Sequence, residues 1–259
     1  MIVSFFGTKG GTGTTALAVN LAAEIRRLTN RSTVIVDLKT GPGDVALFLG
    51  LRLQHTLLDV IDHHAWTDPG TVSQMVGRHQ CGLHVIPAGE VFGRPAPRDA
   101  EAVDQTIRCL NGLYDFVVLD VGSTLTTCAA TALQVSDLVM LVANPDVPCL
   151  RNLQRLVDAV KLAGVVGDRL RIVLNRAADS GVLSTAQIER VLGLTIAHSI
   201  TSDYRTIAAA VNAGVPVSTE QGSVLGTQLE DVARALAGLL KPPPPREDDL
   251  SEYPARMSR

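Results

Sequence analysis

Eight residues near the start of the chain, 8–15 (TKGGTGTT), have the composition of a phosphate-binding loop. Its glycines allow the backbone to wrap closely around phosphate oxygens, while N–H groups at the start of the following helix point toward them. The hydroxyl of Thr15, at the end of the loop, is placed to bind Mg²⁺. The usual G-x-x-x-x-G-K-[ST] pattern is broken twice, because Thr8 replaces its first glycine and Thr14 its lysine. The alternative is a glycine turn that only packs a helix on a strand.

Two carboxylates, Asp37 and Asp120, each end a short apolar run that predicts a buried strand. The carboxyl ends of parallel strands meet at one edge of a sheet, so both side chains are expected beside residues 8–15. Mg²⁺ is usually held through one or two carboxylates. Thr15, Asp37 and Asp120 are therefore the predicted metal site, with Asp120 in the place of the acid that helps to hold Mg²⁺ in P-loop enzymes. The alternative is that each Asp only caps the turn after its strand.

Short apolar runs alternate along the chain with segments of helical periodicity, which predicts an α/β fold. Near-continuous apolar strands separated by helices indicate a mainly parallel sheet with helices on both faces. The expected strands are residues 2–6, 33–37, 82–86, 115–120, 137–142, 170–174 and 194–197, and the clearest helices are residues 16–25, 150–160 and 224–240.

The 259 residues are 46% apolar with a mean hydropathy of +0.22, enough to bury a large core. One nucleotide-binding domain is expected over residues 1–241, and the run PPPPREDD predicts an extended, solvated tail over 242–259. The four cysteines include no CxxC pair, which suits reduced thiols in the cytoplasm.

Charge and hydropathy give no strong sign of nucleic-acid binding or of direct membrane binding. The net charge is −3 without a cluster of Lys and Arg, and no apolar stretch is long enough to span a bilayer. The last predicted helix lacks the basic polar face of a membrane-surface helix. The adjacent His63 and His64 are expected to be a surface pair rather than metal ligands.

Residues 9–15 (KGGTGTT) resemble the deviant Walker loop of the ParA/MinD family of P-loop ATPases. Residues 36–51 (VDLKTGPGDVALFLGL) and 55–61 (HTLLDVI) are similar to the CpaE/TadZ branch, which serves Flp/tight-adherence pilus assembly and commonly has Thr for the loop lysine. Residues 114–120 (YDFVVLD) and 173–176 (VLNR) continue a resemblance that covers about residues 2–240.

The resemblance implies ATP and Mg²⁺ as cofactors and a homodimer with nucleotide at its interface, in which Lys9 reaches the partner's nucleotide. It also implies pilus-assembly partners and a cytoplasmic protein recruited through them to the cell pole or to the inner membrane face. Catalytic roles fall to Lys9, Asp37 and Asp120. The residues assigned to nucleotide binding are Lys9, Gly10, Gly11, Thr12, Gly13, Thr14, Thr15, Lys39, Gly122, Asn175 and Arg176, with Gly122 facing the γ-phosphate and the last two near adenine.

The chain departs from the family at the segment called switch I, which usually reads Asp-x-Asp and whose second Asp positions the attacking water. Lys39 stands at that second position, so ATP hydrolysis is expected to be weak or absent. Lys39 either restores the charge lost at Thr14 or points to solvent. Ser123 and Thr124 stand where relatives often carry Pro, and they are expected to cap the next helix.

Three functions from different classes remain open at this stage. The first is an ATP-binding, dimerising localisation factor for pilus assembly. The second is an active ParA/MinD-type ATPase in partitioning or division-site placement, and the third is a scaffold that binds no nucleotide. The loop glycines with Thr15, Asp37 and Asp120 count against the scaffold, and the lack of a basic patch counts against the second function.

Overall fold

The computed structural model describes residues 1–39, 41–88, 99–165, 167–177, 184–217 and 222–238. The expected tail, 242–259, and the last residues of the expected domain lie outside these ranges. One eight-stranded sheet runs through the molecule in the order β3-β4-β2-β5-β1-β6-β7-β8, and every neighbouring pair is parallel except β3 with β4. The strands are β1 (Ile2–Gly7), β2 (Thr33–Asp37), β3 (Gly77–Arg78), β4 (His84–Ile86), β5 (Phe116–Asp120), β6 (Leu138–Ala143), β7 (Leu170–Ala177) and β8 (Ile196–Thr201).

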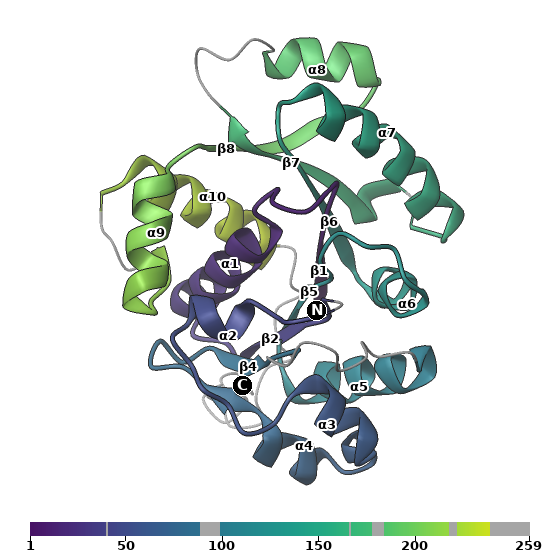
Figure 1. Ribbon diagram of the computed structural model, residues 1–259, viewed down its shortest axis with the longest axis vertical. Helices are drawn as coiled ribbons and strands as arrows, with labels where there is room; N and C mark the ends of the chain where they lie inside the picture. Colours follow the sequence, from purple (N-terminus) through teal and green to yellow (C-terminus); the bar gives the residue numbers. More distant parts are fainter. Residues whose placement is uncertain (40, 89–98, 166, 178–183, 218–221, 239–259) are drawn as a thin grey trace, which may run out of the picture.

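Helices cover both faces of this sheet, as the sequence predicts (Figure 1). One face carries α1 (Thr14–Thr29), α2 (Val45–Phe48), α9 (Tyr204–Ala213) and α10 (Val224–Gly238). The other carries α3 (Leu57–Asp62), α4 (Pro69–Met75), α5 (Ala100–Leu113), α6 (Thr127–Val135), α7 (Val147–Leu162) and α8 (Thr185–Leu192), with the short 3₁₀ helices η1 (Ala65–Thr67) and η2 (Gly167–Arg169) in the connections. None of the helices described here is long and apolar enough to cross a bilayer.

The strand β1 shows how the apolar runs build two cores. All six of its residues are buried, and they alternate between the faces: Ile2 and Phe6 join the core under α5–α7, while Val3 and Phe5 join the core under α1 and α10. Such alternation with both faces apolar is what a sheet covered on both sides requires. The central strands therefore have their register fixed, and with it the positions of the residues that follow each strand.

Three expectations at element ends need correction. The strand expected over 82–86 begins at His84, because Gly82 (φ 84°) belongs to a turn, and the last strand covers Ile196–Thr201 rather than 194–197. The sequence predicts no strand at β3, because this antiparallel strand is only two residues long and too short to give a period-2 pattern. Thr126, not Ser123 or Thr124, caps α6: its backbone is extended and its side chain accepts a hydrogen bond from the N–H of Ala129.

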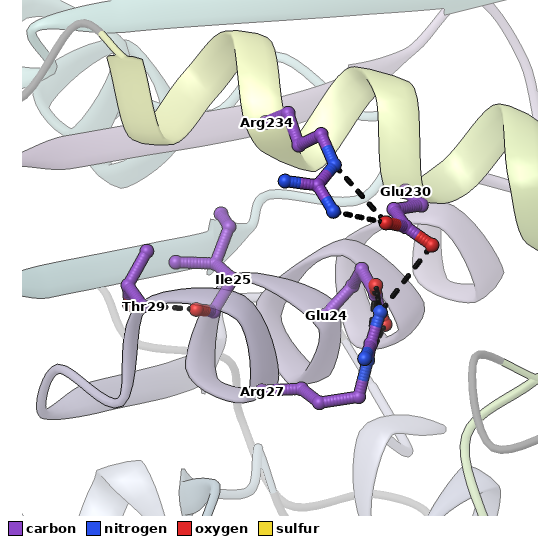
Figure 2. A network of polar contacts seen from close by, with 6 residues as sticks. All are labelled: Glu24, Ile25, Arg27, Thr29, Glu230 and Arg234. Carbon is purple, nitrogen blue, oxygen red and sulfur yellow. Dashed lines mark hydrogen bonds and ion pairs between the residues drawn. The ribbon is translucent and has the colours of Figure 1, made fainter.

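A charged network joins α1 to α10 across the surface of their shared core (Figure 2). Glu24 is buried on α1, and its carboxylate accepts hydrogen bonds from the Nε of Arg27 at 2.9 and 3.1 Å. Arg27 lies 3.4 Å from Glu230 of α10, which also accepts from Arg234 at 3.0 Å. The Glu24 carboxylate therefore depends on Arg27 for its charge partner, and Arg27 connects the two helices.

We predict that Arg27→Ala destabilises the protein by about 1–3 kcal/mol, because it leaves the buried Glu24 carboxylate without its cation. Chemical denaturation measures this loss as a lower midpoint at unchanged slope. The matched control is Arg108→Ala, which removes an equally local i,i+4 pair with Asp104 from an exposed helix surface and should leave the midpoint unchanged. Equal midpoints for wild type and Arg27→Ala would contradict the prediction.

Candidate functional site

The loop between β1 and α1 is held at the carboxyl edge of the sheet by its first two N–H groups. Gly7 donates to the carbonyl of Gly122 at 2.8 Å, and Thr8 donates to that of Val142 at 2.9 Å. The loop ends at Gly13, whose left-handed backbone (φ 88°) starts the sixteen-residue α1. No side chain caps this helix, so its first N–H groups and positive dipole end are directed at the loop. This arrangement is a ready-made site for an anion.

Thr14 turns its side chain under the loop instead of outward. Its hydroxyl lies 3.0 Å from that of Thr12, and the Thr12 hydroxyl lies 3.0 Å from the carbonyl of Lys9. A Cβ on Gly7 would come within 2.4 Å of the Thr14 oxygen, so the Thr14 side chain fills the space between the loop and the end of β1. The residue that replaces the lysine is thus an internal brace of the loop, and it contributes no charge.

The two predicted carboxylates meet beside the loop. Asp37 and Asp120 are direct register partners at the ends of β2 and β5, and both are fully buried. The Thr15 hydroxyl donates to Asp120 Oδ2 at 2.5 Å. Asp37 accepts from the backbone N–H groups of Lys39 at 3.1 Å and of Val45 at 3.2 Å. The structure therefore brings together the three residues that the sequence assigned to Mg²⁺.

Burial of two adjacent acids shapes the electrostatics of this edge. Burial raises the pKa of Asp120 to about 7, and the neighbouring charge of Asp37 adds to the shift. Burial likewise raises the pKa of Asp37, against the hydrogen bonds from the backbone of Lys39 and Val45. A divalent cation between these carboxylates would remove the cost of their charges, so the residues present fit Mg²⁺.

The rest of the edge is consistent with a metal that is shared with a phosphate ligand. Across the part of the chain that the structure describes, no three His, Cys, Asp or Glu side chains gather as a metal cage. Mg²⁺ needs no such cage, because it keeps several waters and takes phosphate oxygens as ligands. Two buried atoms at the same edge, Thr8 Oγ1 and Asn144 Oδ1, have no hydrogen-bond partner among the described residues. A ligand at the loop would add polar groups where these two atoms lie.

We predict that Asp120→Asn stabilises the metal-free protein increasingly as the pH rises. The folded-state pKa of about 7 lies above the unfolded value near 4, so folded wild type binds more protons between them and loses stability through that range. Asn has no charge to bury. The free energy of unfolding of Asp120→Asn should therefore exceed that of wild type by an amount that grows from about pH 4 to about pH 7 and reaches the order of 1–3 kcal/mol at pH 8. Urea denaturation in EDTA across this range measures it.

The control for that series is Asp231→Asn, which removes an exposed carboxylate from α10 and should not reproduce the growing advantage of Asp120→Asn. A constant difference between wild type and Asp120→Asn over the whole range would show that the charge of Asp120 is not what burial penalises.

Two lysines lie at the mouth of the loop, each paired with an acid. Lys9 Nζ lies 3.2 Å from Asp146, the N-cap of α7, with 40% of its side chain exposed. Lys39 forms an ion pair with Asp44, and its stem covers Gly122. Lys39 therefore neither contacts Thr14 nor points freely to solvent. The Gly122 N–H, expected to face a γ-phosphate, donates at 3.3 Å to Asp120 Oδ1 in this structure.

A cavity of about 270 Å³ continues from the loop between α1 and the carboxyl ends of β7 and β8. Asn175 and Arg176, which the resemblance assigns to nucleotide binding near adenine, both line this cavity, and Asn175 Nδ2 also donates to the carbonyl of Thr12 at 2.7 Å. Sequence reasoning missed the contribution of α1 and α10, where Leu17, Leu225 and Leu229 form an apolar wall. Helical periodicity alone cannot reveal this role. A leucine that packs against the core and also lines a cavity gives the same periodic pattern as a leucine that only packs against the core.

A glycine loop over paired carboxylates, at the edge of a doubly covered parallel sheet, defines a P-loop nucleotide-binding protein of the ParA/MinD type. A solved structure of a ParA family ATPase from Chlorobium tepidum shares the fold, with a TM-score of 0.83 and 24% identity over 90% of this chain and 98% of that one. The family model of the cellulose biosynthesis protein BcsQ matches residues 1–198, and the chain belongs to this family.

Two further relatives bear the name MinD, a septum site-determining protein. The one from Thermotoga maritima is 23% identical over 239 residues, which cover 89% of this chain and 85% of that protein. A structure of the one from Pyrococcus horikoshii, in complex with Mg-ADP, has a TM-score of 0.77 and 23% identity over 91% of this chain and 95% of that one. These matches confirm the ParA/MinD family and the fold that the sequence predicted, and none of the proteins described here is named for the CpaE/TadZ branch.

Proposed function

We propose that this protein binds Mg-ATP at residues 8–15, dimerises on it, and acts as a positioning ATPase of the ParA/MinD type. The observation that carries the proposal is the contact of the Thr15 hydroxyl with Asp120, directly beside Asp37 and at the start of α1. This arrangement supplies a hydroxyl and two carboxylates for the metal and backbone N–H groups for the phosphates. The adjoining apolar cavity, with Asn175 and Arg176, suits a nucleobase.

The names of the relatives favour division-site placement or partitioning over pilus assembly as the role. Curated and solved relatives are named for septum-site determination and for ParA, and the family model is named for cellulose biosynthesis. The cargo proposed here is therefore a cell-envelope or division assembly that must be placed at one site. A role with pilus-assembly partners stays a prediction from the sequence of residues 36–51 and 55–61 and from Thr14.

Bound Mg-ATP would supply a reactive γ-phosphate, and the residues of this chain would bind and orient it. The N–H groups of the loop and of the first turn of α1 would donate to phosphate oxygens, while Thr15, Asp37 and Asp120 would hold the metal. Lys39 stands where the resemblance places a water-orienting acid, and Thr14 supplies no charge, so we propose slow hydrolysis. A long-lived ATP-bound dimer follows from slow turnover.

We predict that Thr15→Ala weakens Mg-ATP binding about tenfold or more, because it removes the hydroxyl that would bind the metal and that donates to the Asp120 carboxylate. Hydrogen bonds to charged groups are stronger than those between neutral groups. Fluorescent-ATP titration with and without Mg²⁺ measures the affinity. Thr29→Ala is the matched control on the same helix, since its hydroxyl donates to the carbonyl of Ile25 and accepts from the N–H of Arg31 at the opposite end of α1. If both variants bind as wild type does, the proposed metal site is wrong.

We predict that Lys9→Ala binds ATP but forms no ATP-dependent dimer. The Lys9 side chain is 40% exposed, and its ion pair with Asp146 places it at the mouth of the loop, from which we expect it to reach a partner's nucleotide. Gel filtration with and without Mg-ATP detects the dimer. Lys161→Ala, an exposed lysine at the far end of α7, should dimerise normally. Normal dimerisation of Lys9→Ala would exclude a cross-subunit role for this residue.

One paired measurement separates the three open functions. ATP binding and phosphate release are followed on the same preparation, with Asp37→Ala as the variant. Turnover that Asp37→Ala abolishes supports an active positioning ATPase, while tight binding with negligible release supports a localisation factor that hydrolyses little. Absence of binding in the wild type would leave only the scaffold.

A further inference from the structure

The segment after β2 is closed into a loop by the carboxylate of Asp37. One carboxylate oxygen accepts from the N–H of Lys39 and the other from the N–H of Val45. Gly43 makes this closure possible, because a Cβ at this position would come within 2.3 Å of Asp37 Oδ2. The closure fixes the two ends of the segment next to each other. Lys39 and Asp44 therefore face each other and form an ion pair at the mouth of the site.

The stem of Lys39 lies against Gly122, two residues after Asp120. A Cβ on Gly122 would lie 2.9 Å from Lys39 Cγ, and the carbonyl of Gly122 is bound by Gly7 at the start of the phosphate loop. Only 25% of the Lys39 side chain is exposed. The ammonium of Lys39 is held by the carboxylate of Asp44. Lys39 thus places a positive charge beside a loop whose own position 14 has none.

Asp44 has no structural task that competes with this pairing in the described contacts. It occupies the N-cap position of α2, yet its side chain accepts no capping hydrogen bond, and α2 is only four residues long. Its carboxylate is 44% exposed. Its position therefore suits a reversible partner for Lys39 better than a stabilising cap.

We propose that Asp44 is a positioning residue: it holds the Lys39 ammonium aside when no nucleotide is bound and gives it up to the terminal phosphate of ATP. This inference rests on the proposed function and deepens it, since it names the group that replaces the missing loop lysine and the group that controls it. A partly exposed ion pair contributes little stability, so Lys39 can exchange Asp44 for a partner of higher negative charge. Lys39 of switch I then supplies the positive charge that position 14 lacks. Only a ligand with a third phosphate draws the Lys39 ammonium from Asp44 toward the loop.

The test is a double-mutant cycle on ATP and ADP affinity with Asp44→Asn, Lys39→Ala and the double variant. Asp44→Asn should bind ATP about two- to fivefold more tightly than wild type, because ATP no longer has to break a partly exposed ion pair, and this ratio corresponds to the free energy of such a pair. Lys39→Ala should bind ATP about tenfold more weakly, and the gain from Asp44→Asn should vanish in its background. ADP affinity should change little in every variant, and Asp44→Glu should restore wild-type affinity for ATP.

Each other outcome overturns a specific part of the idea. If Asp44→Asn improves ATP binding equally with and without Lys39, Asp44 only repels the anionic ligand and does not hold the lysine. If Asp44→Asn binds ATP as wild type does, the exchange of partners is wrong although the proposed function stands. If no variant binds either nucleotide while thermal unfolding shows all of them folded, the proposed function fails together with this inference.

Discussion

The structure depends on one constraint: two carboxylates are forced side by side in a buried position at the end of β2 and β5. The register of these strands pairs Asp37 with Asp120 directly, and both strands are locked by apolar residues on their two faces. Burying two like charges on directly paired residues is unfavourable, as the raised pKa values of both acids indicate. The unfavourable placement persists because the surrounding core fixes it, and such stored strain is characteristic of a binding site.

The elements around this pair each offset part of its cost. The Thr15 hydroxyl bonds Asp120, backbone N–H groups bond Asp37, and the charge of Lys39 acts on both acids. The same groups lie beside residues 8–15, so the proposed metal site and the proposed phosphate site share one set of residues. The missing lysine at position 14 fits this view: Thr14 braces the loop from below, and positive charge comes from Lys39 and Lys9 at its mouth.

Family membership and the geometry of the site answer different questions. The BcsQ family model and the ParA/MinD folds establish the architecture, and a shared fold does not by itself establish what a protein does. What distinguishes this chain lies in a few substitutions at the loop and at switch I. Under the proposed function, those substitutions would affect how long a nucleotide stays bound, and they do not identify the cargo.

The sequence by itself determined the fold, the two covered faces and the identity of the loop, Asp37 and Asp120, because periodicity and strand-end residues are local signals. It could not give the edge strand β3, the cap at Thr126 or the apolar wall from α10, since each depends on contacts between distant segments. Only the tertiary structure showed where Thr14 and Lys39 point. Their directions follow from Gly7, Gly122 and Asp44, neighbours set by the closing of a loop on a buried carboxylate, and no pattern within the chain encodes such a closure.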